Sequence, residues 1–155
     1  MNTFQRASVS GTVASVAITL ALAVLARREG KRAVQPMNAT SHWLHGKRAA
    51  RVRKADAAHT LVGYLTHHAS AVFWAYLFER WLGRRRGILA VLPRAAATSG
   101  IAAAVDYGLV PRRLTPGWEH VVSTRSLKTA YVVMGVALAA GVLLHGQRPD
   151  RDVDP

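Results

Sequence analysis

The chain lacks cysteine and has few acidic residues. Its 155 residues include no Cys, which excludes disulfides, thiolate nucleophiles and cysteine-based zinc sites. Eight Asp and Glu stand against 21 Lys and Arg, for a formal net charge of +13. Only 19% of the residues are charged and 50% are hydrophobic, a balance that argues against an ordinary soluble domain. The sequence also lacks a glycine-rich phosphate loop and the G-x-S-x-G elbow of serine hydrolases.

The apolar residues gather in long runs. Residues 7–26 carry no charge, and a helix of this length, at about 1.5 Å per residue, spans the hydrocarbon core of a bilayer. The basic residues that follow favour a retained helix over the alternative, a cleaved signal peptide. With further blocks at residues 57–79, 88–110 and 129–145, the sequence predicts an all-α polytopic membrane protein with four transmembrane helices in a compact bundle.

The segments outside these blocks are polar or basic. We expect residues 1–147 to form a single transmembrane domain and residues 148–155 to form a disordered polar tail. The connection at residues 27–56 carries nine Lys or Arg and is predicted to form a short helix on the membrane surface, or else a solvated basic loop. Trp118 and Tyr131 are expected to anchor the chain at the level of the lipid headgroups.

The distribution of basic residues predicts the orientation. With the N-terminus outside, the first and third connections place thirteen of the 21 Lys and Arg on the cytoplasmic side. The arginines at residues 84–86 oppose this arrangement, and an alternative with three spans and residues 57–82 on the surface would bring them inside. We expect a multi-pass protein of a bacterial inner membrane, with basic flanks that contact anionic lipid headgroups rather than nucleic acid.

Small residues predict how the helices pack. Lipid tails provide no hydrophobic drive for helix association, so helices associate where small residues let their backbones approach closely. The third block carries such a stripe at a spacing of four: Ala96, Gly100, Ala104 and Gly108. Its other side is small as well, with Ala95, Ser99, Ala102 and Ala103. This helix is therefore predicted at the centre of the bundle, and the same pattern would suit a homodimer.

Ionisable residues within the second and third blocks predict two polar pairs. An antiparallel hairpin of these blocks places Glu79 level with Arg94. The same register places His67 or His68 level with Asp106. Buried charges need partners, because their desolvation costs several kcal/mol. Neighbouring helical residues point in different directions, so the two histidines are expected to face different partners. The alternative is that Arg94 and Asp106 reach the headgroups and the histidines are neutral hydrogen-bonding residues.

Seven histidines raise the alternative of a metal or haem protein. The segments HWLH and HTLVGYLTHH resemble part of the histidine boxes of membrane di-iron hydroxylases, a resemblance that implies histidine-bound iron. The spacing from His59 to His67 is too wide for such a box, and too few histidines remain for two irons. Haem held between His67 and His145 would require both residues at mid-membrane. We therefore expect no metal site and no cofactor.

Two further segments carry a resemblance. NATSHWLHG and DYGLVPRRLTPGWE resemble small multi-pass inner-membrane proteins of Arg- and Ala-rich proteobacteria, which have no assigned activity; the resemblance implies no catalytic residues. We expect a non-catalytic structural, assembly or transport-associated subunit that forms a homodimer or a larger membrane complex. The alternative is a histidine-dependent redox protein, or one that binds metal or haem.

Overall fold

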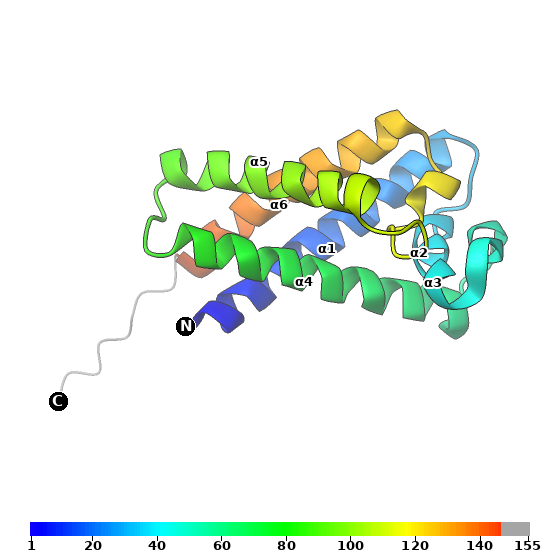
Figure 1. The fold of residues 1–155 in the computed structure, drawn as a ribbon, viewed down its shortest axis with the longest axis horizontal. Coiled ribbons are helices and arrows are strands. Elements are labelled where there is room, and N and C mark those ends of the chain that lie inside the picture. The colour runs from blue at the N-terminus through cyan, green and yellow to red at the C-terminus, as the bar shows by residue number, and fades with distance from the viewer. Residues whose placement is uncertain (147–155) are drawn as a thin grey trace.

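The protein is a bundle of helices. The computed structural model describes residues 1–146, and every regular element in this range is helical. The four long helices are α1 (Thr3–Arg28), α4 (Val62–Leu82), α5 (Ile88–Ala104) and α6 (Thr124–Gly146), as Figure 1 shows. The predicted all-α bundle is thus confirmed. The tail predicted at residues 148–155 lies outside the described residues.

Three of the long helices have the length and hydropathy of a membrane span. They are α1, the continuous helix Ile88–Leu109 that α5 forms with the π-helical turn η3 (Val105–Leu109), and Thr124–His145 of α6. α4 is not among them. It carries His67, His68 and Glu79 along its length, and these polar residues lower its mean hydropathy.

Three of the long helices extend beyond the predicted blocks, among them α4, which ends at Leu82 rather than at residue 79. α1 begins at Thr3 because Asn2 caps it: the Asn2 side chain accepts from the Gln5 amide at 2.9 Å, and the Gln5 side chain accepts from the Asn2 amide at 3.0 Å. α6 begins at Thr124, so its first turn precedes the predicted block at residues 129–145. At 23 residues, α6 is longer than α4, which has 21.

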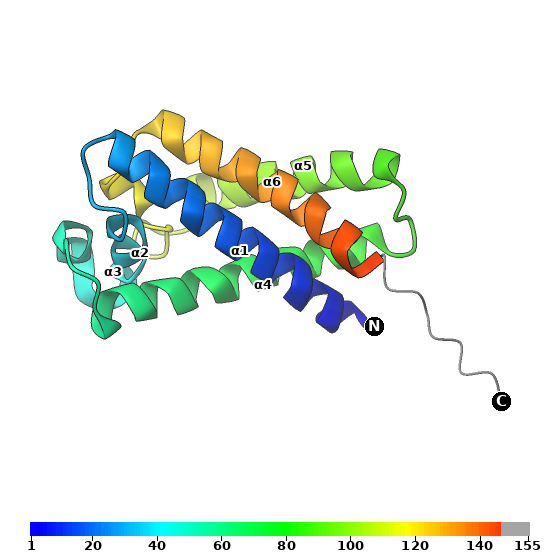
Figure 2. The ribbon, with the colours of Figure 1, turned by 180° about the vertical axis from the view of Figure 1, so that it is seen from behind.

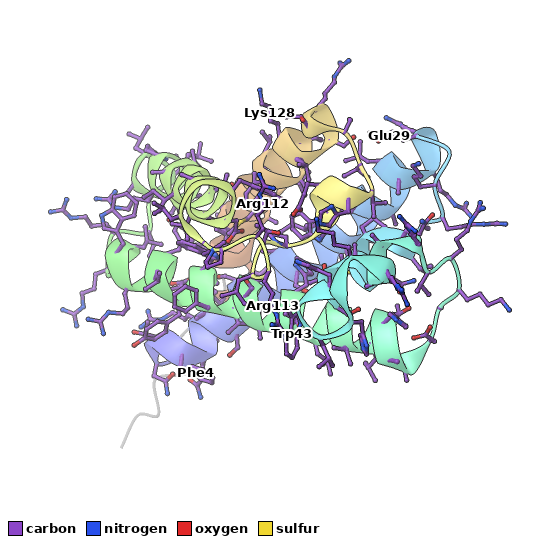
Figure 3. All side chains as sticks on the ribbon, turned by 45° about the vertical axis from the view of Figure 1, so that its right-hand side comes forward. Phe4, Glu29, Trp43, Arg112, Arg113 and Lys128 are labelled. Carbon is purple, nitrogen blue, oxygen red and sulfur yellow. The ribbon has the colours of Figure 1, made fainter. Side chains whose placement is uncertain are left out.

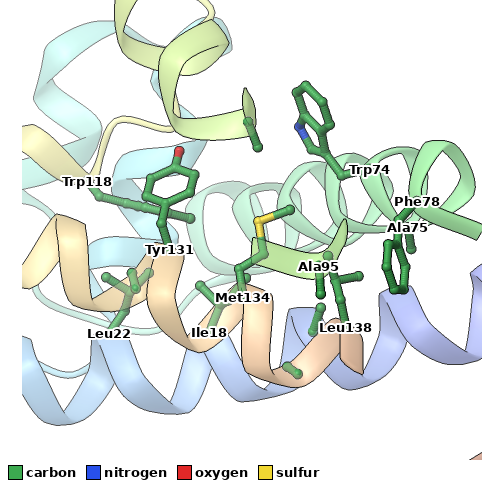
Figure 4. Packing of buried hydrophobic residues seen from close by; sticks show 14 of the residues in the cluster. Ile18, Leu22, Trp74, Ala75, Phe78, Ala95, Trp118, Tyr131, Met134 and Leu138 are labelled. Atoms are coloured by element: carbon green, nitrogen blue, oxygen red, sulfur yellow. The ribbon is translucent and has the colours of Figure 1, made fainter. Parts of the chain in front are cut away.

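α1 is the central helix of the bundle. It packs along both α4 and α6, while α5 packs mainly on α6, as the two opposite views show (Figures 1 and 2). Glycines make these approaches close. A Cβ on Gly11 would lie 2.6 Å from the Val72 Cα, and one on Gly141 would lie 2.6 Å from the Ser10 Cα. Figure 4 shows larger side chains, such as Phe78, filling the remaining space.

The first connection is folded rather than loose. It contains α2 (Gln35–Thr40), α3 (His42–His45), the 3-10 helix η1 (Gly46–Arg51) and the π-helical turn η2 (Ala57–Leu61). Every residue of α2 is buried, whereas Lys47, Arg48 and Arg51, basic residues of the predicted surface helix, are exposed in η1. In α2, the buried polar side chain of Asn38 is satisfied, because its amide donates to the carbonyls of Val52 and Lys54 at 2.8 and 3.0 Å. The chain therefore folds around Asn38 and leaves its basic residues outside.

The two ends of the bundle differ in composition. One end, termed the basic end, contains the first connection, residues 27–61, and the connection between α5 and α6, residues 110–123 (Figures 1 and 2). The other end contains the N-terminus, the turn between α4 and α5, and the end of α6. The connections thus bring α2 and α3 beside the loop that precedes α6, and this junction encloses the site described below.

Glu29, labelled in Figure 3, joins the end of α1 to the start of α6. Its carboxylate accepts hydrogen bonds from the Ser123 amide at 2.8 Å, the Ser123 hydroxyl at 2.7 Å and the Ser126 hydroxyl at 2.5 Å. These bonds, led by that from Ser126, hold the pKa of Glu29 below its ordinary value of 4.5. Because the pKa is lower in the folded state, the bonds stabilise the fold above pH 4.5. This stabilisation is lost as the pH falls through the folded pKa.

We expect Glu29→Gln to lower the melting temperature by a few degrees at neutral pH. The variant should also lose less stability than wild type when the pH is lowered below 4.5, because it lacks the carboxylate that acid protonates. Thermal unfolding of both proteins in detergent, at neutral and acidic pH, measures the two effects. Identical acid sensitivity in the two proteins would contradict a stabilising role for these bonds.

Candidate functional site

A cavity of about 210 Å³ lies at the junction of the bundle and its connections. Residues of α1, α2, α3, α4, η3 and α6 line it, together with the loop that leads into the 3-10 helix η4 (Trp118–His120). Two of its lining residues, His67 and Asp106, are ones that the sequence singled out. We term it the aromatic cavity, after three other lining residues, Trp74, Trp118 and Tyr131.

His67 is held by the backbone of α1. Its side chain is buried, and its Nε2 lies 3.2 Å from the Ser15 carbonyl oxygen. A carbonyl only accepts hydrogen bonds, so Nε2 carries the proton and Nδ1 is left as an acceptor. His68 reaches the same residue, with its Nδ1 3.2 Å from the Ser15 hydroxyl. The expectation of different partners is therefore wrong, because the small Ser15 lies between the two imidazoles.

Asp106 belongs to the π-helical turn η3, the wider turn that continues α5. Its Oδ2 accepts a hydrogen bond of 2.6 Å from the Tyr131 hydroxyl of α6. Asp106 and His67 both line the aromatic cavity, but the predicted pair does not form, because Asp106 bonds to Tyr131 and His67 to the Ser15 carbonyl. No hydrogen bond joins the two side chains in the described part of the chain. Tyr131, which the sequence analysis assigned to the membrane surface, is instead the direct partner of Asp106.

Tryptophans from separate segments form much of the cavity wall. Trp118 is 4% exposed and donates from Nε1 to the Thr40 hydroxyl at 3.0 Å. Its ring lies 5.5 Å from that of His67 and 6.1 Å from that of Tyr131. Figure 4 shows Trp118 beside Tyr131, with Trp74 farther along α4. Trp118 and Tyr131 are thus buried, so the prediction that they anchor the chain at the headgroups is wrong.

Trp43 of α3 completes the wall nearer the surface. Its Nε1 donates to the Thr66 hydroxyl at 3.2 Å, and its carbonyl accepts from Arg113 Nε at 3.2 Å. Figure 3 shows Trp43 next to Arg113. Sequence reasoning missed this wall, because its residues come from segments whose contacts no local periodicity reveals.

A second buried polar group, the Glu79 cluster, lies near the other end of the bundle. It consists of Glu79, Ser10, His145 and Arg86. The Glu79 carboxylate, 2% exposed as a residue, lies 2.8 Å from His145 Nε2, 2.8 Å from the Ser10 hydroxyl and 3.0 Å from Arg86 Nη2. The predicted pair of Glu79 with Arg94 is wrong. Arg86, in the turn, folds back onto the carboxylate, and a register of two straight helices does not describe that return.

Arg94 has other partners. Its Nη1 donates to the Ala90 carbonyl at 3.0 Å, and its guanidinium lies 5.7 Å from the centre of the Trp81 ring. Both Ala90 and Trp81 lie close to the turn that joins α4 to α5. A charged side chain placed over tryptophan retains favourable electrostatics without a carboxylate partner.

The Glu79 cluster contains a serine, a histidine and a carboxylate, but it is not a catalytic triad. A triad requires the imidazole to contact the nucleophile through one nitrogen and the acid through the other. Here His145 Nε2 contacts both Ser10, at 3.3 Å, and Glu79. Ser10 also donates directly to the carboxylate. This arrangement neutralises and holds a buried charge, and it does not activate Ser10.

The predicted packing stripe of α5 lies on the outside. Ala96, Gly100, Ala104 and Gly108 are exposed. A Cβ on Gly100 would meet nothing within 4 Å. The opposite face packs instead: Ala95, Ser99 and Ala102 are buried, and the Ser99 hydroxyl donates to the Tyr131 carbonyl of α6. Both faces are small, so composition alone does not distinguish the face that turns inward.

The histidines come together in pairs: the rings of His45 and His59 lie 4.6 Å apart, and those of His42 and His120 lie 5.8 Å apart. Across residues 1–146, no three His, Asp or Glu side chains gather in a way that could hold a metal ion. His67 contacts Ser15 and His145 contacts Ser10, positions on α1 that lie more than one helical turn apart. Each imidazole therefore contacts its own protein partner, and the pair does not form two axial ligands of one haem.

Comparisons of the chain with protein families, with curated proteins and with solved structures find no match.

Proposed function

We propose that this chain is an integral membrane protein whose four long helices all cross the bilayer, and that it serves as a non-catalytic structural, assembly or transport-associated subunit. The observation that carries this proposal is the distribution of polar and apolar side chains on α4. Its buried side contains His67 and Glu79, whereas Leu65, Phe73 and Leu77 are 56%, 54% and 40% exposed. A helix in water has the opposite arrangement.

The other long helices also expose large apolar side chains. These include Leu20 at 62%, Leu89 at 90%, Ile101 at 52% and Val132 at 67%. Contiguous exposed apolar surface of this extent is uncommon in soluble monomers, and lipid tails would cover it. At 21 residues, α4 extends about 31 Å, which matches the thickness of a hydrocarbon core. Its place beside α1 supports a fourth span despite its lower hydropathy.

The charge distribution supports the orientation, with the N-terminus outside the cytoplasm. The basic end and the adjoining first turns of α6 together carry thirteen Lys and Arg: Arg27, Arg28, Lys31, Arg32, Lys47, Arg48, Arg51, Arg53, Lys54, Arg112, Arg113, Arg125 and Lys128. Six lie toward the other end within residues 1–146: Arg6, Arg80, Arg84, Arg85, Arg86 and Arg94. Basic residues accumulate on the cytoplasmic side, where they also contact anionic headgroups. A bacterial inner membrane suits this arrangement.

Single cysteines test the topology cleanly, because the chain contains no native thiol. We expect a membrane-impermeant maleimide to label Arg84→Cys in intact cells. Arg48→Cys and Arg113→Cys should react only after permeabilisation. Labelling of Arg113→Cys alone would mean that α4 does not cross the bilayer, and the reverse of the expected pattern would contradict the orientation. Release of the protein from membranes by high salt without detergent would contradict membrane integration altogether.

A separate measurement tests the subunit role. Purified in mild detergent, the protein should retain a stoichiometric partner or a second copy of itself. A strictly monomeric chain without a partner would contradict this part of the proposal and leave the topology untouched.

A further inference from the structure

The walls of the aromatic cavity contain most of the tryptophans of this chain. Three of its four tryptophans line the cavity, namely Trp43, Trp74 and Trp118, and Tyr131 joins them. Four different elements, α3, α4, η4 and α6, contribute these rings. Rings from separate elements that surround one space form the kind of enclosure in which proteins hold organic cations, since the face of an aromatic ring attracts positive charge.

The charges in the cavity lining also favour a bound cation. The chain has a net charge of +13, yet no Lys or Arg lines the aromatic cavity. Its acidic residue is Asp106, whose Oδ2 accepts from Tyr131 and whose Oδ1 accepts no hydrogen bond from residues 1–146. His67 directs its Nε2 to the Ser15 carbonyl and so does not serve as the partner of Asp106. The carboxylate thus has room for a counter-ion that the protein does not supply.

The size limits the ligand. The cavity measures about 210 Å³, and a protein cavity of about 150 Å³ admits benzene. An ion of a few carbons fits, whereas a lipid does not. An alkali ion would require several oxygen ligands. The hydroxyls of Thr40, Thr66 and Thr115 also line the cavity, but each already donates to a backbone carbonyl.

We propose that the aromatic cavity binds a small organic cation, an ammonium that carries short alkyl groups, with Asp106 as its counter-ion and the surrounding tryptophans as its walls. This inference goes beyond membrane placement. It requires only the folded bundle, so it holds or fails independently of the orientation and of the subunit role. The bound ion would replace solvent next to the carboxylate and link η3 to α4 and η4.

Tryptophan fluorescence tests the proposal on the purified full-length protein in mild detergent. Choline chloride should change the emission saturably, with sodium chloride at equal ionic strength as the baseline. Asp106→Asn keeps the shape of the side chain but removes its charge, and should weaken choline binding about tenfold or more. Trp74→Phe should reduce the signal. Trp81→Phe, which alters the tryptophan outside the cavity, should bind choline as wild type does.

A neutral ligand provides the decisive comparison, because it needs no variant. The alcohol in which carbon replaces the quaternary nitrogen of choline has nearly the same shape and no charge, and it should bind at least about tenfold more weakly than choline. Equal binding of the two by wild type would overturn the proposal, as would unchanged choline affinity in a folded Asp106→Asn variant. Absence of any saturable response to choline would also overturn it.

Discussion

Gly63→Ala is expected to disrupt the bundle. A Cβ at this position would lie 1.8 Å from the carbonyl oxygen of Met37 and 2.9 Å from its carbonyl carbon, well inside van der Waals contact. The obstacle is backbone, and it cannot yield easily. α2 is fully buried, and the hydrogen bonds of the Asn38 side chain to the carbonyls of Val52 and Lys54 fix it in place. We expect a loss of about 3 kcal/mol or more in the free energy of unfolding.

Gly100→Ala provides the matched control. Gly100 is also helical, but nothing lies within 4 Å of a Cβ placed there. Alanine favours a helix over glycine by about 1 kcal/mol, so this variant should be as stable as wild type or slightly more stable. Thermal unfolding by circular dichroism in detergent, with size-exclusion profiles, measures both. Equal stability of the two variants would show that α2 does not lie against α4 as described.

Glu79→Ala should lower the free energy of unfolding by a comparable amount, through electrostatics rather than a steric clash. The change removes the shared acceptor of Ser10, His145 and Arg86 and leaves their polar groups buried beside a void. Removal of one partner from a buried ion pair typically costs about 3–5 kcal/mol. Arg86→Ala should cost less, because Glu79 would keep its contacts with Ser10 and His145.

Arg84→Ala is the control for the Glu79 cluster. Arg84 lies in the same turn but is exposed, and surface charges contribute little to stability. We expect no measurable change in its melting temperature in detergent, against a clear decrease for Arg86→Ala and a larger one for Glu79→Ala. If Arg84→Ala and Arg86→Ala melt alike, the Arg86–Glu79 contact has no energetic role.

The positions of the long helices can be predicted from the sequence of each segment alone. Runs of apolar residues with basic flanks predicted where α1, α5 and α6 lie, because length and hydropathy are properties of a segment alone. The ends of α1 and α6 were missed, since capping by Asn2 and a polar first turn add helix beyond the apolar run. α2 was missed for another reason: Asn38 and Gln35 read as polar loop residues until the carbonyls that they bind are known.

The site was predicted only where a simple register applies. Counting along two straight helices predicts His67 level with Asp106; both line the aromatic cavity, but each bonds to another residue. It failed for Glu79, because Arg86 belongs to a turn that folds back. Nothing in the sequence indicated that Trp118 is buried, since its partner Thr40 lies 78 positions away, and such a contact depends on how whole helices are arranged.

If α4 crosses the bilayer, as we propose, its inward polar side affects how this helix enters the membrane during synthesis. Emerging without neighbours, α4 would expose His67 and Glu79 to hydrocarbon, and partitioning would be unfavourable. α1 is made first and offers the Ser15 carbonyl and the Ser10 hydroxyl to those two side chains. α1 would thus supply the hydrogen-bond partners that make the insertion of α4 less unfavourable. The order of the helices in the sequence would then matter for insertion, because α1 is synthesised before α4.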